Sequence, residues 1–471
     1  MSQNLIAAIE IGSQQVSAII GRKEPDGAIN VIAAEQEPSS KFIQRGRVFN
    51  PDLMTQCLRN IVERLETRSH KAINQIYVTV GGLGLRSVQN QVTRSYGEAT
   101  KITSEIVDSV LDENLSLSIP GYKILDVLPL EYKLGVQSLF DPVGVVSNRV
   151  VGNFLDIMIP AQSQEQMENS FRAADLPIAD TLVGPLYLAN TILTDAEKLS
   201  GCAFVDMGAD TTTIGIFESK LLRFLAVLPL GGANVTRDLM TVLSIEEQEA
   251  EELKRRHGKA YVEVNDGTPV AHDNIRLQDG RSIPYDQVVN IIEARMNEIV
   301  QNVAHIIKNL ANYSPDRLIG GLVLTGGASN MTAIDRAMIE STHIRKLRFV
   351  KNAPLAVRPG KLTNFNIDGT FNTVLAVVDS VDEECCSDER KTPGIFDSQV
   401  TEEELKRQQE EAEQKRQQEE EEERQRQEEA AAQRAEEERR RREERFKGVK
   451  SVFGSFKRVL SDVFTEPGEE D

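Results

Sequence analysis

The chain has 471 residues, of which 40% are hydrophobic, so a single small binding module is excluded and several packed lobes are expected. Its 73 acidic and 54 basic side chains give a net charge of −19, which opposes general nucleic-acid binding. The four cysteines (Cys57, Cys202, Cys385 and Cys386) have neither the number of a disulfide scaffold nor the spacing of a zinc site, and they favour a reducing, cytosolic setting.

The N-terminal segment has no basic leader, and polar residues such as Glu10 and Ser13 interrupt its apolar stretch. No stretch of the sequence reaches the roughly 18–20 apolar residues that cross a bilayer. We therefore expect neither a secretion signal nor a membrane span.

Two glycine-containing hairpins are predicted far apart in the sequence. Residues 5–20 (LIAAIEIGSQQVSAII) predict a strand ending in Glu10, a tight turn at residues 12–15 and a second strand. Residues 202–217 repeat this design about 196 residues later, with the turn at residues 208–211. Two similar hairpins indicate an internal duplication.

A third turn, at Gly326 and Gly327, follows a buried strand predicted over Leu322–Thr325 and precedes a helix. Backbone N–H groups at such a turn can meet a nucleotide. Each turn alone is typical of an ordinary structural turn, because glycine turns are common. None of the three is a Walker A loop or a Rossmann fingerprint, but their joint occurrence and order are more specific.

The composition changes near residue 383. The preceding part alternates short apolar strands, glycine turns and helices of period 3.6, which is typical of α/β proteins. Residues 402–445 are almost only Glu, Arg, Lys, Gln and Ala and offer no apolar stripe to bury. We predict a charged linker over residues 384–445, as either a partly helical spacer or a solvated disordered tail.

The linker leads to residues 446–464 (FKGVKSVFGSFKRVLSDVF), whose apolar positions fall on one helical face. A basic amphipathic helix at the end of a polar tether is typical of an interfacial membrane anchor. The alternatives are packing on its own domain and a protein partner with a groove for the helix. The predicted membrane-binding residues are Phe446, Val449, Val452, Phe453, Phe456, Val459, Leu460, Val463 and Phe464, with Lys447, Lys450, Lys457 and Arg458 off the stripe.

The order of the two hairpins and the third turn resembles the actin, Hsp70 and sugar-kinase superfamily, in which two phosphate hairpins and an adenosine loop close around ATP between duplicated lobes. Within it, the chain is similar to the bacterial FtsA cell-division family. Residues 228–260 resemble a segment of the form GGxxVTxDI followed by an AExxK helix, and residues 124–149 resemble a block in the lobe peculiar to that family. With the C-terminal amphipathic helix, the resemblance covers nearly the whole chain.

The resemblance implies an α/β, actin-like fold of duplicated, ribonuclease H-like lobes with an FtsA-type inserted subdomain. The charged linker and the C-terminal amphipathic helix follow. The expected parts are a first lobe (1–82, 166–202 and 361–383), the insertion (83–165), a second-lobe base (203–233 and 309–360), its cap (234–308), the linker (384–445) and the helix (446–464).

The resemblance also implies a site for ATP and Mg²⁺ between the lobes. The implied nucleotide-binding residues are Gly12, Ser13, Gln14 and Gln15 in the first phosphate turn, Gly208, Thr211 and Thr212 in the second, Gly231, Gly232 and Asn234 along the cleft, Glu251 and Lys254 at the ribose or adenine, and Gly326 and Gly327 behind the base. Glu10 and Asp206 are the implied metal-site residues, with Asp206 facing Mg²⁺ through water. Without the family, Glu251 and Lys254 would be interpreted as a surface ion pair and the glycine pair as a strand turn.

The chain departs from the family pattern at three positions. Glu10 stands where the first motif usually carries Asp, Asp210 replaces a glycine of the second motif DxGxGTTD, and Thr213 replaces its last acid. Asp210 either repels a γ-phosphate or joins the metal shell. We therefore expect ATP binding with weak or absent hydrolysis, and we assign no catalytic residue.

The resemblance implies a peripheral protein on the cytoplasmic face of the cell membrane at the division septum. It implies binding of the FtsZ C-terminal peptide and of other division proteins, membrane tethering of FtsZ filaments, and ATP-dependent self-assembly into actin-like filaments. Arg295 and Glu298, on a helix predicted over residues 288–300, are the candidate FtsZ contacts, with a solvated helix face as the alternative.

Two rival functions share the fold. The first is an ATP-dependent phosphotransferase of the sugar or acid kinase type, for which we identify neither a catalytic acid aimed at an acceptor hydroxyl nor a substrate-lined cleft. The second is another actin-like filament ATPase, which a tail dispensable for membrane binding would favour.

Overall fold

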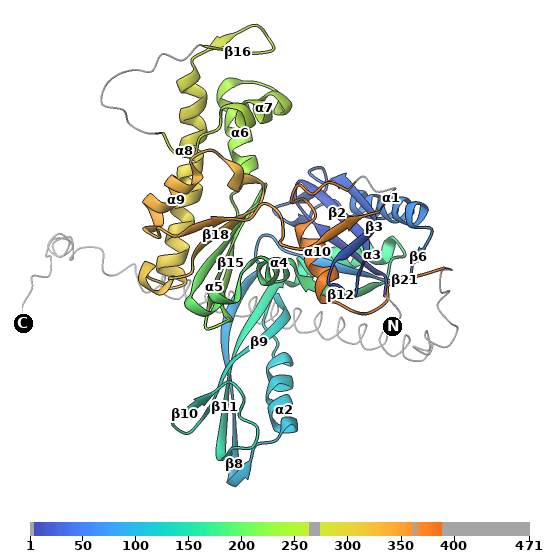
Figure 1. Cartoon of the computed structure of the whole chain (residues 1–471), viewed down its shortest axis with the longest axis vertical. Coiled ribbons are helices and arrows are strands. Elements are labelled where there is room, and N and C mark those ends of the chain that lie inside the picture. Colours follow the sequence, from blue (N-terminus) through green and yellow to red (C-terminus); the bar gives the residue numbers. More distant parts are fainter. Residues whose placement is uncertain (1–3, 263–273, 361–364, 389–471) are drawn as a thin grey trace, which may run out of the picture. The chain divides into compact units, whose positions relative to one another are not determined.

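The computed structural model (Figure 1) describes residues 4–262, 274–360 and 365–388. The predicted amphipathic helix and the linker from residue 389 onward lie outside the described residues. Within those described ranges, no helix is both long and apolar enough to cross a membrane.

A six-stranded sheet with the order β12-β7-β1-β2-β3-β20 forms the first lobe. Its strands are β1 (Ile6–Ile11), β2 (Gln15–Lys23), β3 (Ile29–Pro38), β7 (Ile76–Val80), β12 (Ile178–Val183) and β20 (Val357–Pro359). The helices packed on it are α1 (Pro51–Ser69), α3 (Ala161–Ala173), α4 (Gly184–Ile192) and α10 (Asn372–Ser380), with α1 against α3 and α4 against α10. Short strand pairs flank it, namely β4 (Ile43–Gln44) with β5 (Arg47–Val48) and β6 (Ala72–Ile73) with β21 (Cys386–Ser387).

Local sequence explains where α1 begins and ends. The Asn50 side-chain oxygen accepts a hydrogen bond from the Leu53 N–H at 3.2 Å, and Pro51 takes the first helical position, where its fixed φ is suitable. The helix ends at His70, which adopts a left-handed φ of 55°. Leu58 and Ile61, three residues apart on one face, are fully buried. This face packs on β3.

The second sheet has nine strands in the order β10-β9-β11-β8-β15-β14-β13-β18-β19. The second lobe contributes β13 (Cys202–Met207), β14 (Thr212–Glu218), β15 (Leu221–Leu228), β18 (Gly321–Thr325) and β19 (Leu347–Phe349). The insertion contributes β8 (Arg86–Lys101), β9 (Tyr122–Leu134), β10 (Gln137–Leu139) and β11 (Val146–Pro160), together with helix α2 (Ser104–Leu115). The two parts join where Ala226 of β15 pairs with Arg86 of β8, so the insertion extends the second lobe's sheet.

The second lobe also contains helices and short elements, some beside its sheet and others beyond one end of it (Figure 1). They are α5 (Asp195–Ser200), α6 (Gly232–Leu243), α7 (Glu247–His257), β16 (Ile275–Arg276), β17 (Ser282–Ile283), α8 (Tyr285–His305), a π-helix (Ile306–Leu310), 3-10 helices (Pro315–Arg317 and Gly327–Asn330) and α9 (Ile334–Thr342). The predicted cap, made of α6, α7 and α8, shares one continuous apolar core with β13, β14 and β18.

The predicted duplication is confirmed by the strand orders. Five strands of the first sheet, β12-β7-β1-β2-β3, correspond in order and direction to β19-β18-β13-β14-β15 of the second. The two hairpins also share their register, because Ile11 pairs with Val16 in one and Met207 pairs with Thr212 in the other. Each lobe therefore presents one hairpin turn at the same place in its sheet.

The chain returns to the first lobe earlier than predicted. We expected the second-lobe base to run to residue 360, but β20 pairs in parallel with β3, so Val357 already belongs to the first sheet. The insertion likewise ends earlier than residue 165, because α3 begins at Ala161 and packs on α1. Sequence patterns fix such borders poorly, because strand pairing decides them.

The insertion has a separate small core, in which Phe154 of β11 is fully buried and contacts Tyr132 edge to face with ring centroids 6.0 Å apart. We expect Phe154→Ala to lower the local stability of the insertion by about 3–5 kcal/mol, because the lost burial leaves a cavity. Hydrogen exchange of the β11 amides should accelerate accordingly. Phe140→Ala, whose side chain is 63% exposed, is the control and should leave this exchange unchanged. Equal exchange in both variants would contradict the packing.

Candidate functional site

The two predicted phosphate turns have the same tight geometry. A Cβ added at Gly12 would lie 2.6 Å from the Gln15 carbonyl oxygen, and one added at Gly208 would lie 3.0 Å from the Thr211 carbonyl oxygen. The Gly208 N–H donates to that Thr211 oxygen at 2.9 Å. A side chain at Gly12 would therefore displace the first turn, and one at Gly208 would be tightly packed against the second.

A third element, the turn between β4 and β5, brings these two turns together. The Gly46 N–H donates to the Ser13 hydroxyl oxygen at 2.8 Å, and the neighbouring Arg45 N–H donates to the Asp210 carboxylate at 3.1 Å. Gly46 thus contacts the first predicted phosphate turn, and Arg45, the residue before it, contacts the second. Sequence reasoning missed this element, although a glycine in a two-residue loop between short strands is a hairpin signal.

Backbone hydrogen bonds from the start of α6 hold the second predicted phosphate turn in place. The N–H groups of Gly232 and Ala233 donate to the carbonyl oxygens of Gly208 and Ala209 at 3.0 and 2.8 Å. A Cβ at Gly231 would lie 2.6 Å from the Gly208 oxygen, so a larger residue would displace the turn. The Asn234 side-chain oxygen in turn accepts from the Gly231 N–H at 3.0 Å. Gly231, Gly232 and Asn234 therefore position this turn.

Glu251 and Lys254 of α7 pair with each other beside the start of α6. The Lys254 Nζ donates to the Glu251 carboxylate at 2.5 Å and to the Gly232 carbonyl oxygen at 3.3 Å. Burial acts to raise the pKa of Glu251, but the hydrogen bonds from Lys254 and Thr236 outweigh it and lower that pKa. The ion pair that we gave as the alternative interpretation is present. It is not fully at the surface, because only 14% of the Lys254 side chain is exposed.

The third turn lies against the end of β13. Gly326 has a φ of 87°, and a Cβ there would overlap the Asp206 carboxylate and lie 2.5 Å from the Met207 carbonyl oxygen. A Cβ at Gly327, by contrast, would meet no atom within 4 Å. The turn therefore touches the predicted metal-site residue at Gly326 and is open at Gly327.

The two predicted metal-site residues interact electrostatically. Burial raises the pKa of Glu10 to about 7, a hydrogen bond with the Thr373 side chain acts to lower it, and the charge of Asp206 raises it further. Burial raises the pKa of Asp206 to about 6. Repulsion between two half-buried carboxylates is the situation that a divalent cation relieves.

The donor set fits a magnesium ion that is also held by phosphates. The described part of the chain has no group of three or more His, Cys, Asp or Glu side chains that could hold a metal. Mg²⁺, however, is commonly bound through one or two carboxylates, substrate phosphates and waters. Glu10 and Asp206 would supply the carboxylates.

Asp210 and Thr212, both in the second phosphate hairpin, are held by protein partners. Asp210 is 8% exposed, accepts from the Arg45 N–H and forms an ion pair with Arg237 of α6. Thr212 is fully buried, and its hydroxyl donates to the Leu230 carbonyl oxygen at 2.8 Å. The Thr212 side chain thus holds β14 to the segment before α6, and a contact of Thr212 with a nucleotide stays a prediction.

The candidate partner residues lie on α8 within the cap. The Arg295 guanidinium donates two hydrogen bonds to Asp238 of α6, at 2.5 and 2.9 Å, and also contacts Glu298. About a quarter of the Arg295 side chain and half of the Glu298 side chain are exposed. The pair is therefore accessible, but it also links two helices of the cap.

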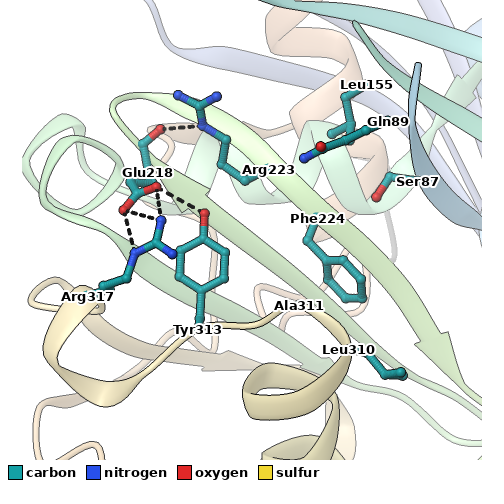
Figure 2. A pocket seen from close by; sticks show the side chains of 10 residues that line it. All are labelled: Ser87, Gln89, Leu155, Glu218, Arg223, Phe224, Leu310, Ala311, Tyr313 and Arg317. Atoms are coloured by element: carbon teal, nitrogen blue, oxygen red, sulfur yellow. Dashed lines mark hydrogen bonds and ion pairs between the residues drawn. The ribbon is translucent and has the colours of Figure 1, made fainter. Parts of the chain in front are cut away.

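A separate cavity of about 450 Å³ lies between residues 310–317 and the sheet, where strands of the insertion and of the second lobe meet (Figure 2). Arg317 donates to both carboxylate oxygens of Glu218, and the Tyr313 hydroxyl donates to one of them at 3.1 Å. Burial, together with the Glu218 charge, raises the pKa of Tyr313 to about 12. Ser87 and Phe224 line its other end. None of the predicted nucleotide-binding residues lines this cavity.

The sequence is similar to known proteins of one family. The family model described as "Cell division protein FtsA" matches residues 203–375, and that of the SHS2 domain inserted in FtsA matches residues 82–157. The FtsA of Porphyromonas gingivalis is 32% identical over 344 residues, which are 71% of this chain and 70% of the relative. The FtsA of Escherichia coli K12 is 25% identical over 340 residues, which are 70% of this chain and 80% of the relative.

Among solved structures, a PilM-PilN type IV pilus biogenesis complex superposes with a TM-score of 0.55 at 15% identity, covering 79% of this chain and 97% of that one. This likeness concerns the fold alone. The duplicated sheets, the insertion and the matching structure confirm the predicted actin-like fold with its FtsA-type insertion. From these matches, and above all from the relative in Porphyromonas gingivalis, the chain belongs to the FtsA family of cell division proteins.

Proposed function

We propose that this protein binds ATP with Mg²⁺ in the cleft between its lobes, self-assembles in that state, and tethers FtsZ filaments to the cytoplasmic face of the cell membrane at the division septum. Membership of the FtsA family supports the role in division. One observation carries the nucleotide site: three turns that are far apart in the sequence approach one another around Asp206 and Asp210.

Two features of the cleft support binding of a nucleotide phosphate chain. Gly12 and Gly208 keep both turns free of side chains at their first positions, which lets a phosphate approach the backbone. Glu10 and Asp206 have raised pKa values, so a cation between them and the phosphates would be favoured. When bound, Mg²⁺ would neutralise phosphate charge, and Glu10 and Asp206 would orient its water shell.

We propose that hydrolysis is weak or absent. Glu10 is one methylene longer than the Asp that this motif usually carries, so the water shell of a bound metal would have to shift. The Asp210 carboxylate is already bound by Arg45 and Arg237, so it is not available to orient an attacking water. ATP then acts by closing the cleft rather than by phosphoryl transfer.

The membrane attachment rests on the sequence of the C-terminal tail. Residues 446–464 combine one apolar face with four cations, which suits the interface of an anionic bilayer. Residues 402–445, which form most of the linker, would reach about 65 Å if they were fully helical. Since a single interfacial helix binds modestly, self-assembly would strengthen attachment by presenting many helices at once.

Arg295 and Glu298 are our candidates for contact with the FtsZ C-terminal peptide. Both side chains are partly exposed on α8, and Arg295 is already oriented by Asp238. A guanidinium held in this way can receive a peptide carboxylate with little further loss of side-chain freedom.

The metal site predicts a pH dependence. We expect Mg²⁺ to increase ATP affinity little at pH 5.5 and much more at pH 8, because Asp206 and Glu10 must lose protons with pKa values of about 6 and 7 before they can hold the ion. Calorimetric titration with ATP, with and without Mg²⁺, measures this increase. Protons on ATP itself also titrate in this range, so Asp206→Asn is the comparison and should lose most of the effect. Identical pH profiles for the wild type and Asp206→Asn would contradict the site.

The anchor predicts a loss of membrane binding. Replacing Phe453 and Phe456 with Glu puts two charges on the apolar face, so we expect the protein to leave anionic liposomes in a cosedimentation assay. Replacing Ser451 and Ser455 with Glu adds the same charge off that face and should preserve most of the binding. If the phenylalanine variant sediments like the wild type, the tail is not the anchor.

The partner site predicts weaker FtsZ binding. We expect Arg295→Ala to raise the Kd for the FtsZ C-terminal peptide about tenfold, because a charged contact is lost. Fluorescence anisotropy with a labelled peptide measures this constant. Arg281→Ala, which removes an arginine of the cap paired with Asp279, is the control. An unchanged Kd for Arg295→Ala would exclude this contact.

A further inference from the structure

The Asp210 carboxylate occupies a set of donors that would suit a phosphate. It accepts from the Arg45 N–H at 3.1 Å and pairs with the Arg237 guanidinium. Arg45 and Gly46 both have left-handed φ angles, of 52° and 73°, so their N–H groups belong to a hairpin tip. The Gly46 N–H donates to the Ser13 hydroxyl, whereas the Arg45 N–H and the Arg237 guanidinium both contact the Asp210 carboxylate. A backbone N–H of a turn together with a guanidinium is a typical pair of donors for an anion.

This donor set lies between the two predicted phosphate turns. Gly46 donates to Ser13 in the first turn, whereas Arg45 donates to Asp210 in the second. An anion at the Asp210 carboxylate would therefore be next to the phosphate chain of a nucleotide bound by both turns. Asp210 is itself a residue of the second turn, and it is only 8% exposed. Its carboxylate therefore lies among these donors rather than in solvent.

We propose that the Arg45 N–H and the Arg237 guanidinium form the subsite for the terminal phosphate of a nucleoside triphosphate, and that Asp210 is its resident anion. This inference rests on the proposed nucleotide site. It adds the residues that determine whether the site prefers a triphosphate or a diphosphate. A triphosphate must displace the Asp210 carboxylate from Arg237 and tolerate its charge, whereas a diphosphate need not reach it. Asp210 therefore lowers the preference for ATP over ADP.

Asp210 also links the two lobes. Its bond to the Arg45 N–H joins the second lobe to the first. Of the positively charged side chains, Arg237 is the one that pairs with Asp210, and 45% of it is exposed, so it can turn toward an incoming phosphate. The Arg237 guanidinium would then pair with either the Asp210 carboxylate or the terminal phosphate.

The test compares the Kd values of Mg-ATP and Mg-ADP by calorimetry on the full chain. Asp210→Gly removes the resident anion, and Asp210→Asn keeps its shape without its charge. For both variants we expect the ratio of the ATP Kd to the ADP Kd to fall by about tenfold, because the charge conflict with the terminal phosphate is lost. Adding Arg237→Ala to Asp210→Gly should cancel this gain for ATP and leave ADP binding unchanged.

Asp26→Asn is the matched control, since it neutralises an aspartate paired with an exposed arginine, Arg358, away from the cleft. Its ratio should equal that of the wild type. If both Asp210 variants change the two Kd values in parallel, or leave the ratio unchanged, Asp210 merely holds the loop and this inference is wrong while nucleotide binding stands. If the wild type binds neither nucleotide at millimolar concentration, the proposed function fails and the inference fails with it.

Discussion

Close backbone approach around the end of β13 is the constraint on which this structure depends. At Gly231 and Gly326 an added side chain would collide with the second phosphate turn or with Asp206, so three segments can meet only because these positions lack one. The N–H groups at the start of α6 then fix the turn from behind. A site built in this way places backbone donors near a ligand and leaves little room for side chains, which is how proteins commonly bind phosphates.

Three carboxylates lie close to the two predicted phosphate turns. They are Glu10, Asp206 and Asp210, and Asp210 forms an ion pair with Arg237. Glu10 and Asp206 respond to burial by raised pKa values, whereas Asp210 is compensated by an arginine and a backbone N–H.

The insertion and the second lobe form one continuous sheet. The pairing of Ala226 with Arg86 continues the ladder from β15 into β8, and the cavity beside this junction is lined by Glu218, Arg317 and Tyr313. The insertion nevertheless has its own core around Phe154. The insertion is therefore joined to the second lobe by strand pairing and is stabilised by apolar packing of its own.

The sequence alone determined the hairpins and the duplication, because period-two strands around glycine turns are local patterns that do not depend on distant residues. It also indicated the family through Gly231, Gly232 and the segment after them. Only the tertiary structure decided that Arg45 and Gly46 bridge the two turns, that Asp210 pairs with Arg237, and that Thr212 faces the core. Each of these contacts joins residues that are distant in the sequence or on different elements, so its existence depends on how the sheets pair and where the helices pack, and no local pattern encodes that.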